Sequence, residues 1–129
     1  MIRLEAVERH SDVRGALIKA WPAAVAGEVY AVELRPGHPR GHHWHRHGGE
    51  WFMALHGSAW LVVEDPKTGD RRVVRLETHR AYVPAGIAHA LYCDAPALIL
   101  AVADVHHDDE DTVRHAVQAP SAAERSAPC

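Results

Sequence analysis

Two histidines, His43 and His45, stand two positions apart in a segment bounded by glycines. Side chains at alternate positions of a β-strand point to the same face, so a strand here would direct both imidazoles at one point. Glu50 follows five residues later, on or near the next strand, and can add a carboxylate to the same space. Two imidazoles and a carboxylate that face one space form an arrangement typical of a metal site.

A fourth candidate ligand, His89, follows the turn-forming segment Pro84-Ala-Gly86-Ile-Ala. Neutral imidazole and carboxylate ligands suit Fe, Zn, Cu, Ni or Mn. The alternative interpretation is that these residues are ordinary polar side chains in the mouth of a barrel. The chain has 12 histidines in 129 residues, and we interpret the others near this segment as rim or surface residues: His38, His42, His47 and His56.

The bulk composition is that of one soluble globular domain, with 47% hydrophobic and 24% charged residues. A net charge of -3 gives no indication of a nucleic-acid or membrane partner. The chain is charged from its third residue and has neither a signal-peptide block nor an apolar run long enough to span a bilayer. Two cysteines, Cys93 and Cys129, make no disulfide framework, so we expect a cytoplasmic protein.

Short strands separated by turn signals account for most of the chain. The predicted strands are Ile2–Val7, Ala16–Trp21, Val29–Leu34, His43–His45, Trp51–Leu55, Ser58–Glu64, Arg71–Leu76, Ala81–Val83, Ala88–Tyr92 and Leu98–Ala103. No convincing amphipathic helix lies between them, which predicts an all-β sandwich or barrel over residues 1–117. Asp108–Val117 could begin with a short helix, and residues 118–129 are predicted to form a flexible C-terminal tail.

The spacing of the candidate ligands resembles the two motifs of the cupin family. The first motif is matched by Gly37, His43, His45, Glu50 and Gly57, and the second by Pro84, Gly86 and His89. Two family positions outside the ligand set differ, being occupied by Thr78 and Cys93. The resemblance implies a single cupin-type jelly-roll β-barrel. It also implies one divalent metal ion (Zn, Fe, Mn, Ni or Cu) bound by His43, His45, Glu50 and His89.

A narrower resemblance covers most of residues 10–115. The segments Asp12-Val-Arg14-Gly15-Ala-Leu17, Val29-Tyr30 and Pro39-Arg40-Gly41-His42-His43-Trp44-His45 are similar to segments of dTDP-sugar 3,4-ketoisomerases. The Arg-Gly-x-His element is shared with dTDP-4-dehydrorhamnose 3,5-epimerases, and His43–Phe52 resembles the zinc-binding cupin domain of capsular-polysaccharide reductases. The resemblance implies an isomerase or epimerase acting on a keto-sugar nucleotide in polysaccharide or deoxysugar biosynthesis.

The same resemblance implies roles for individual residues. His43 and His45 would carry protons, Arg40 would bind the nucleotide diphosphate, and Tyr30 would act as an acid or positioning group. However, a histidine whose lone pair binds a metal is not free to act as a base with it. If metal is bound, it would polarise the sugar carbonyl, and the base would be another residue: Tyr30, Tyr92 or His56.

Two other functions fit the same ligands. They could hold Fe(II) in a cupin dioxygenase, or a metal or small ligand in a non-catalytic binding cupin. Trp44, Trp51 and Trp60 are interpreted as packing residues or as part of a dimer surface, and the expected partners are a nucleotide-linked sugar and a second copy in a homodimer.

Overall fold

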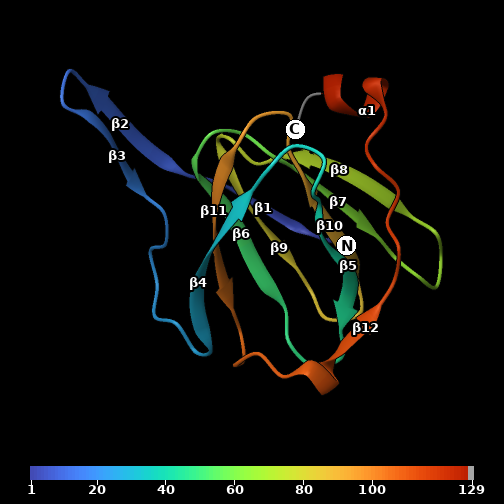
Figure 1. Cartoon of the computed structure of the whole chain (residues 1–129). Helices are drawn as coiled ribbons and strands as arrows, with labels where there is room; N and C mark the ends of the chain where they lie inside the picture. The colour runs from blue at the N-terminus through green and yellow to red at the C-terminus, as the bar shows by residue number, and fades with distance from the viewer. Residues whose placement is uncertain (128–129) are drawn as a thin grey trace.

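Two five-stranded antiparallel sheets face each other in the computed structural model, which describes residues 1–127 (Figure 1). The first sheet contains, in spatial order, β1 (Arg3–Ala6), β9 (His79–Val83), β6 (Glu50–His56), β11 (Ala97–Ala103) and β4 (Glu28–Leu34). The second contains β12 (Thr112–Arg114), β5 (Arg40–His45), β10 (Ala88–Tyr92), β7 (Trp60–Glu64) and β8 (Arg71–Arg75). The predicted all-β architecture is therefore confirmed.

The core lies between the two sheets. It is formed by every second residue of a strand, whose side chain points inward. In β11, Ile99 and Ala101 are fully buried in this core, whereas Leu100 between them faces the other side of the sheet. Leu61 and Val63 of β7 contribute from the second sheet, and both are also fully buried. Burial of each such aliphatic side chain contributes about 1.5–3 kcal/mol to the free energy of folding, because its apolar surface is removed from water.

The strand β5 contains a bulge that decides which of its side chains face the core. His89 pairs with His43, and the next residue of β10, Ala90, pairs with Gly41. Strand β5 therefore has one extra residue at this point, His42. Gly41 and His42 both have positive φ angles, of 98° and 58°. The bulge shifts the alternation by one residue, and Arg40, which pairs with the core residue Leu91, joins His43 on the inner side. The sequence predicted that this strand begins at His43, but it begins three residues earlier, at Arg40.

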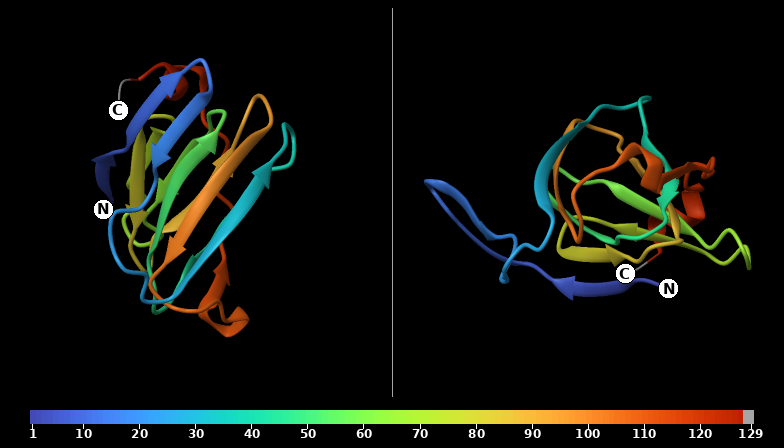
Figure 2. Two further views of the ribbon diagram at one scale, coloured as in Figure 1. Left: turned by 90° about the vertical axis from the view of Figure 1, so that its left-hand side faces the viewer. Right: turned by 90° about the horizontal axis from the view of Figure 1, so that it is seen from below.

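A hairpin formed by β2 (Glu8–Asp12) and β3 (Gly15–Lys19) projects from the barrel as an arm (Figure 2). The predicted turn is present, and the Asp12 carboxylate accepts a 2.8 Å hydrogen bond from the backbone N–H of Arg14 within it. Strand β2 is missing from the sequence prediction because its residues are all polar and exposed. It forms by pairing with β3, not by burial of a face.

The three tryptophans interpreted as packing or dimer residues all pack within the chain. Trp51 lies on the outer face of the first sheet, where its ring centroid is 5.3 Å from that of Trp21. Trp44 packs on the outer face of the second sheet against a buried cluster that includes Ala88 and Val117. Trp60 is covered by the guanidinium of Arg125, 5.0 Å from its ring centroid.

The short helix predicted at the start of Asp108–Val117 is present as a single turn. Asp108 does cap a turn, accepting from the N–H of Glu110, but the turn is the short 3-10 helix η1 (Asp109–Asp111). The β-branched residues Thr112 and Val113 then leave the turn and pair with β5 as strand β12. The chain thereby closes the edge of the second sheet.

The segment predicted as a flexible tail, residues 118–129, folds back on the second sheet as far as it is described. Helix α1 (Ala122–Ser126) begins with a capping box between Ser121 and Glu124, and Glu124 accepts a 2.8 Å hydrogen bond from Arg71 of β8. Residues 128–129 lie outside the described part. No helix in residues 1–127 has the length and apolar character needed to cross a membrane.

Candidate metal and substrate site

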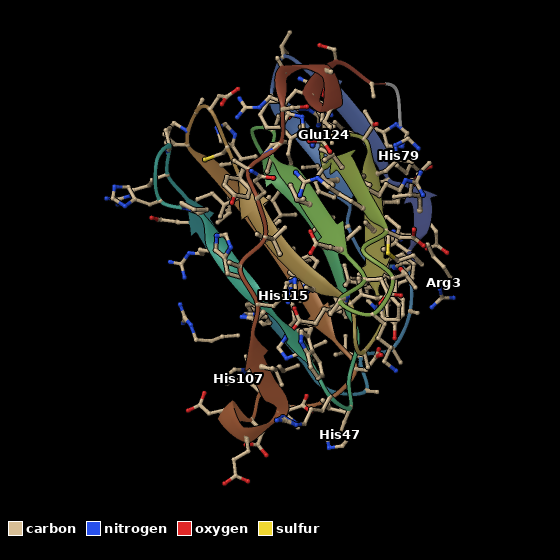
Figure 3. The ribbon with its side chains drawn as sticks, turned by 90° about the vertical axis from the view of Figure 1, so that its right-hand side faces the viewer. Arg3, His47, His79, His107, His115 and Glu124 are labelled. Atoms are coloured by element: carbon tan, nitrogen blue, oxygen red, sulfur yellow. The ribbon has the colours of Figure 1, made fainter. Side chains whose placement is uncertain are left out.

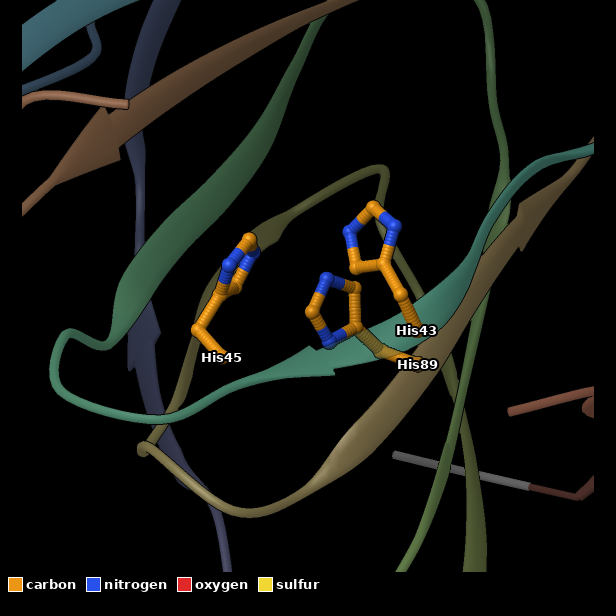
Figure 4. Close-up of side chains that lie close together, drawn as sticks. All are labelled: His43, His45 and His89. Atoms are coloured by element: carbon orange, nitrogen blue, oxygen red, sulfur yellow. The ribbon is translucent and has the colours of Figure 1, made fainter. Parts of the chain in front are cut away.

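Three histidines from two neighbouring strands converge inside the barrel (Figure 4). His43 and His45 extend from β5 and His89 from β10, and their candidate ligand atoms all lie within 4.8 Å of one another. The ring centroids of His43 and His45 are 4.8 Å apart, and those of His43 and His89 are 4.9 Å apart. The common face predicted for His43 and His45 is therefore present, and His89 joins it across the strand pair.

The buried environment keeps two of these imidazoles in the neutral state. Burial, together with the neighbouring His43, lowers the pKa of His89 to about 4. Burial and the charge of His45 also lower the pKa of His43. Neutral imidazole is the form that binds a metal ion.

Two ring nitrogens are also suited to ligation. His89 Nδ1 lies 3.2 Å from the carbonyl oxygen of Ile87, and because a carbonyl only accepts, Nδ1 carries the hydrogen and Nε2 keeps its lone pair. His45 Nε2 is buried and makes no hydrogen bond with any residue in 1–127. An uncompensated buried nitrogen is costly, so this atom fits a site for a metal ion.

Glu50, the predicted carboxylate ligand, lies beside the histidine cluster. Its Oε1 is 3.3 Å from His45 Nε2, an ion-pair distance without hydrogen-bond geometry, and its side chain is 10% exposed. Burial acts to raise the pKa of Glu50, but the adjacent His45, the hydrogen bond from Tyr30 and the charge of His89 outweigh it, so this pKa is below its usual value. The carboxylate thus stays ionised, and it raises the pKa of His45 against the opposing effect of burial.

A cavity of about 150 Å³ opens in front of the cluster, between β4 and β5. Its lining comprises Tyr30, Val32, Arg40, Gly41, His43, Glu50, Phe52, His89 and Leu91. The Tyr30 hydroxyl donates a 2.7 Å hydrogen bond to Glu50 Oε2, and burial with the adjacent Glu50 charge raises the pKa of Tyr30 far above its ordinary value. Arg40 is an exposed side chain of this lining, and its Nε donates to the carbonyl oxygen of Glu33 at 3.1 Å.

Two of the residues predicted as candidate bases, Tyr92 and His56, lie outside this cavity. The Tyr92 hydroxyl donates to the carbonyl oxygen of Val117 at 2.8 Å, on the outer face of the second sheet. His56 is exposed and ends β6, at the opposite end of that strand from Glu50. His47 lies at the rim near η1 (Figure 3), where its side chain is 80% exposed. Of the three candidate bases, only Tyr30 lines the cavity.

Three residues near the cluster are absent from the sequence prediction. Thr112 Oγ1 is 3.4 Å and Asp111 Oδ2 is 4.0 Å from His45 Nδ1, on the side of the ring opposite the cavity. His107 lines an adjoining cavity of about 280 Å³ with Tyr30, His43, His45, Glu50 and Glu28. No spacing pattern indicates these residues, because the chain returns to the site more than 50 residues after His45.

Solved structures with the same fold include three enzymes of sugar nucleotides. The dTDP sugar isomerase from Desulfovibrio desulfuricans G20 matches with a TM-score of 0.78 at 18% identity, over 89% of this chain and 83% of that one. The TDP-quinovose 3,4-ketoisomerase WlaRB from Campylobacter jejuni gives 0.72 at 20% identity, over 88% and 92%. The 3'-monoepimerase ChmJ from Streptomyces bikiniensis, bound to dTDP-quinovose, gives 0.77 at 16% identity, over 88% and 68%. These likenesses confirm the predicted cupin-type jelly-roll fold.

Comparison with the curated proteins gives no match. A family model described as the polysaccharide biosynthesis C-terminal domain matches residues 10–94 of the 129. This range includes most of the arm, the cavity lining and all four candidate ligands. The chain therefore belongs to the polysaccharide biosynthesis C-terminal domain family.

Proposed function

We propose that this protein is an isomerase or epimerase that acts on a keto-sugar nucleotide. The observation that carries the proposal is the cavity lining, where the Tyr30–Glu50 pair lies with His43, His89 and Arg40. Solved structures of this fold named as 3,4-ketoisomerases and as a 3'-monoepimerase, some bound to TDP or to a TDP-sugar, support this reaction class.

Such a reaction removes a proton from a carbon beside a carbonyl and returns a proton at another position. The negative charge that develops on the carbonyl oxygen needs a nearby proton donor or cation. Tyr30 holds its proton at the hydroxyl, since its pKa is far above the ordinary value, and Glu50 fixes the direction of that hydroxyl. Without metal, neutral His43 is a nitrogen base in the same lining.

We further propose that His43, His45, His89 and Glu50 bind one divalent metal ion: Zn, Fe, Mn, Ni or Cu. The unsatisfied His45 Nε2 and the neutral state of His43 and His89 support this assignment. When bound, the ion would act as a Lewis acid toward the substrate carbonyl. The lone pairs of His43 and His45 would then be occupied, Tyr30 would donate the proton, and His107, which lines the adjoining cavity with Tyr30, would be the imidazole that takes the proton from carbon.

The size of the cavity and the position of Arg40 indicate how the substrate would lie. About 150 Å³ is below the roughly 300–1,000 Å³ of pockets that enclose a drug-sized ligand, so this cavity would hold only the sugar, with the adjoining cavity of about 280 Å³ beside it. The diphosphate would remain at the exposed edge, where the Arg40 guanidinium can make a bidentate contact with phosphate oxygens.

The test is incorporation of solvent deuterium into dTDP-4-keto-6-deoxyglucose and related keto-sugar nucleotides, with metal-free and metal-loaded protein. We expect exchange at the carbon beside the carbonyl and an isomeric product. Exchange should persist in His47→Gln, which alters an exposed rim histidine, and should be lost in His43→Gln. No exchange with any of several keto-sugar nucleotides contradicts the proposed reaction.

A second candidate function is an Fe(II)-dependent dioxygenase. The observation that favours it is the apolar part of the lining, Val32, Phe52 and Leu91, which lies in a small cavity with two imidazoles of the histidine cluster, His43 and His89. Oxygen consumption by Fe(II)-loaded protein with small apolar substrates would select this function. Stoichiometric metal or ligand binding without turnover in either assay would select the third alternative, a non-catalytic binding cupin.

We also propose that the protein forms a homodimer through the β2–β3 arm. An isolated two-stranded hairpin is marginally stable in water, and this arm leaves Leu17 56% exposed. Strand β4, at one edge of the first sheet, leaves Val29 49% exposed. A second copy offers the same arm and the same edge, so a two-fold dimer can cover both at once.

A further inference from the structure

The closing strand β12 lies directly against the metal-ligand strand β5. Thr112 pairs with His45 across the two strands, and its Oγ1 lies 3.4 Å from His45 Nδ1. The two residues are 67 positions apart in the chain, so only the fold brings them together. The contact is on the opposite side of the imidazole from Nε2, the nitrogen nearest to Glu50.

A buried carboxylate stands behind this contact. Asp111 Oδ2 lies 4.0 Å from His45 Nδ1, and the Asp111 side chain is 10% exposed. Its Oδ1 accepts a 2.9 Å hydrogen bond from the backbone N–H of His47, and its carbonyl oxygen accepts one of 2.8 Å from the N–H of Arg46. The carboxylate is thus fixed to the end of β5, two residues beyond the ligand.

We propose that Thr112, supported by Asp111, is a positioning residue that accepts the Nδ1–H of His45 and thereby directs the Nε2 lone pair into the cluster. The inference rests on the metal site of the proposed function. In the opposite tautomer the hydrogen would lie on Nε2, where Glu50 Oε1, 3.3 Å away, is outside hydrogen-bond geometry and residues 1–127 offer no other acceptor. The Nδ1–H tautomer instead has the hydroxyl oxygen of Thr112 as acceptor and the negative charge of Asp111 beyond it.

His89 shows the same device with a different partner. Its Nδ1–H is held by the backbone carbonyl of Ile87, two residues away on the same segment. His45 depends instead on a side chain that arrives from the end of the domain. The orientation of the His45 ring therefore depends on the docking of η1 and β12. Substitutions in that segment should change metal binding even though they replace no ligand.

The first test is nitrogen NMR of the histidine rings in metal-free protein at alkaline pH, where the imidazoles are neutral. We expect His45, assigned by loss of its signals in His45→Gln, to carry its hydrogen on Nδ1. Thr112→Val keeps the shape of the side chain but removes the acceptor, and should move His45 towards the Nε2–H tautomer. Thr112→Ser should restore the wild-type signals, and His89 should not change in either variant.

The second test is titration of metal-free protein with Zn²⁺ alone. Loss of such an outer hydrogen bond typically weakens metal binding about 10–100-fold, which we expect for Thr112→Val, whereas Thr112→Ser should bind like wild type. The matched control is Thr78→Val, which removes a threonine–histidine contact of 2.9 Å at His79, outside the site.

Two results would overturn the positioning role: an Nε2–H tautomer of His45 in the wild type, or a Thr112→Val protein with unchanged tautomer and unchanged Zn²⁺ affinity. If wild-type protein binds no Zn²⁺ or other divalent metal but shows the Nδ1–H tautomer and its loss in Thr112→Val, the metal site of the proposed function is wrong and the positioning role stands.

Discussion

The Tyr30 hydroxyl donates a 2.7 Å hydrogen bond to Oε2 of Glu50. The other oxygen of this carboxylate lies 3.3 Å from Nε2 of His45, so Glu50 links a tyrosine of the first sheet to the histidine cluster of the second. This link places a retained proton and a retained negative charge side by side in the cavity. The proposed proton chemistry depends on both.

Removing the Tyr30 hydroxyl should therefore impair turnover without removing the metal ligands. We expect Tyr30→Phe to slow deuterium exchange about 10²–10⁴-fold, the usual contribution of a positioned acid or base. Metal content, measured by atomic emission, should stay at the wild-type level. Tyr92→Phe is the control, since that hydroxyl bonds to Val117 on the outer face. Equal rates in wild type and Tyr30→Phe would remove Tyr30 from the mechanism.

The histidine cluster predicts a sharp difference between two neighbouring residues. His45→Ala should lose stoichiometric metal because it removes the buried nitrogen that faces His43 and His89. His47→Ala should keep it, because the His47 side chain is 80% exposed at the rim. Metal analysis of proteins purified without a histidine tag checks this pair. Equal loss in both variants would show that the cluster is not the binding site.

The ion pair that anchors α1 should make a pH-dependent contribution to stability. Hydrogen bonds from Arg71 lower the pKa of Glu124 to about 2 from an ordinary value of 4.5. A carboxyl group whose pKa is lower in the folded than in the unfolded state stabilises the fold at any pH above its unfolded-state pKa. This stabilisation is lost as the pH falls through its folded-state pKa. Because the pair is partly exposed, we expect a contribution of about 1 kcal/mol or less.

The measurement is the difference in unfolding free energy between wild type and Glu124→Gln. It should be constant above about pH 5 and disappear towards pH 2. Glu110→Gln, a substitution at an exposed acidic residue outside the Arg71–Glu124 pair, serves as the control. A difference that persists unchanged at pH 2 would assign the effect of Glu124 to packing rather than charge.

A charge in place of the exposed Leu17 of the arm should disrupt the proposed homodimer. Leu17 and Ser11 lie on opposite faces of the β2–β3 arm, since Leu17 pairs with His10 and Ser11 with Ala16. We expect Leu17→Glu to halve the mass measured by light scattering, and Ser11→Glu to leave it unchanged. A monomeric wild type, or a dimeric Leu17→Glu protein, would refute this interface.

The parts of the site that sequence could predict are those specified by local geometry. Strand alternation is enough to place His43 and His45 on one face, and the motif around Pro84 and Gly86 identifies His89. The capping box of Ser121 and Glu124 is also a local signal, although the composition of residues 118–129 suggests a flexible tail instead. The docking of that helix depends on Arg71 of β8, which no local pattern connects to it.

The remaining features depend on contacts between distant segments. Thr112 and Asp111 reach His45 only because β12 pairs with β5 in one particular register. Strand β2 forms from five polar residues because β3 is available as its partner, which overrides their low strand propensity. The exclusion of Tyr92 and His56 from the cavity likewise required the structure, since neither residue type nor spacing separates them from Tyr30.

Because of the bulge at Gly41 and His42, the side chains of Arg40, His43 and His45 all face the inner side only if the number of residues between them is unchanged. Deleting one residue there would restore simple alternation and turn either Arg40 or both histidines out of the cavity. A side chain at Gly41 would place its Cβ 2.7 Å from the His89 carbonyl oxygen. Related sequences should therefore align through this segment without gaps, and a graft of the site onto another barrel would have to transfer all six residues together.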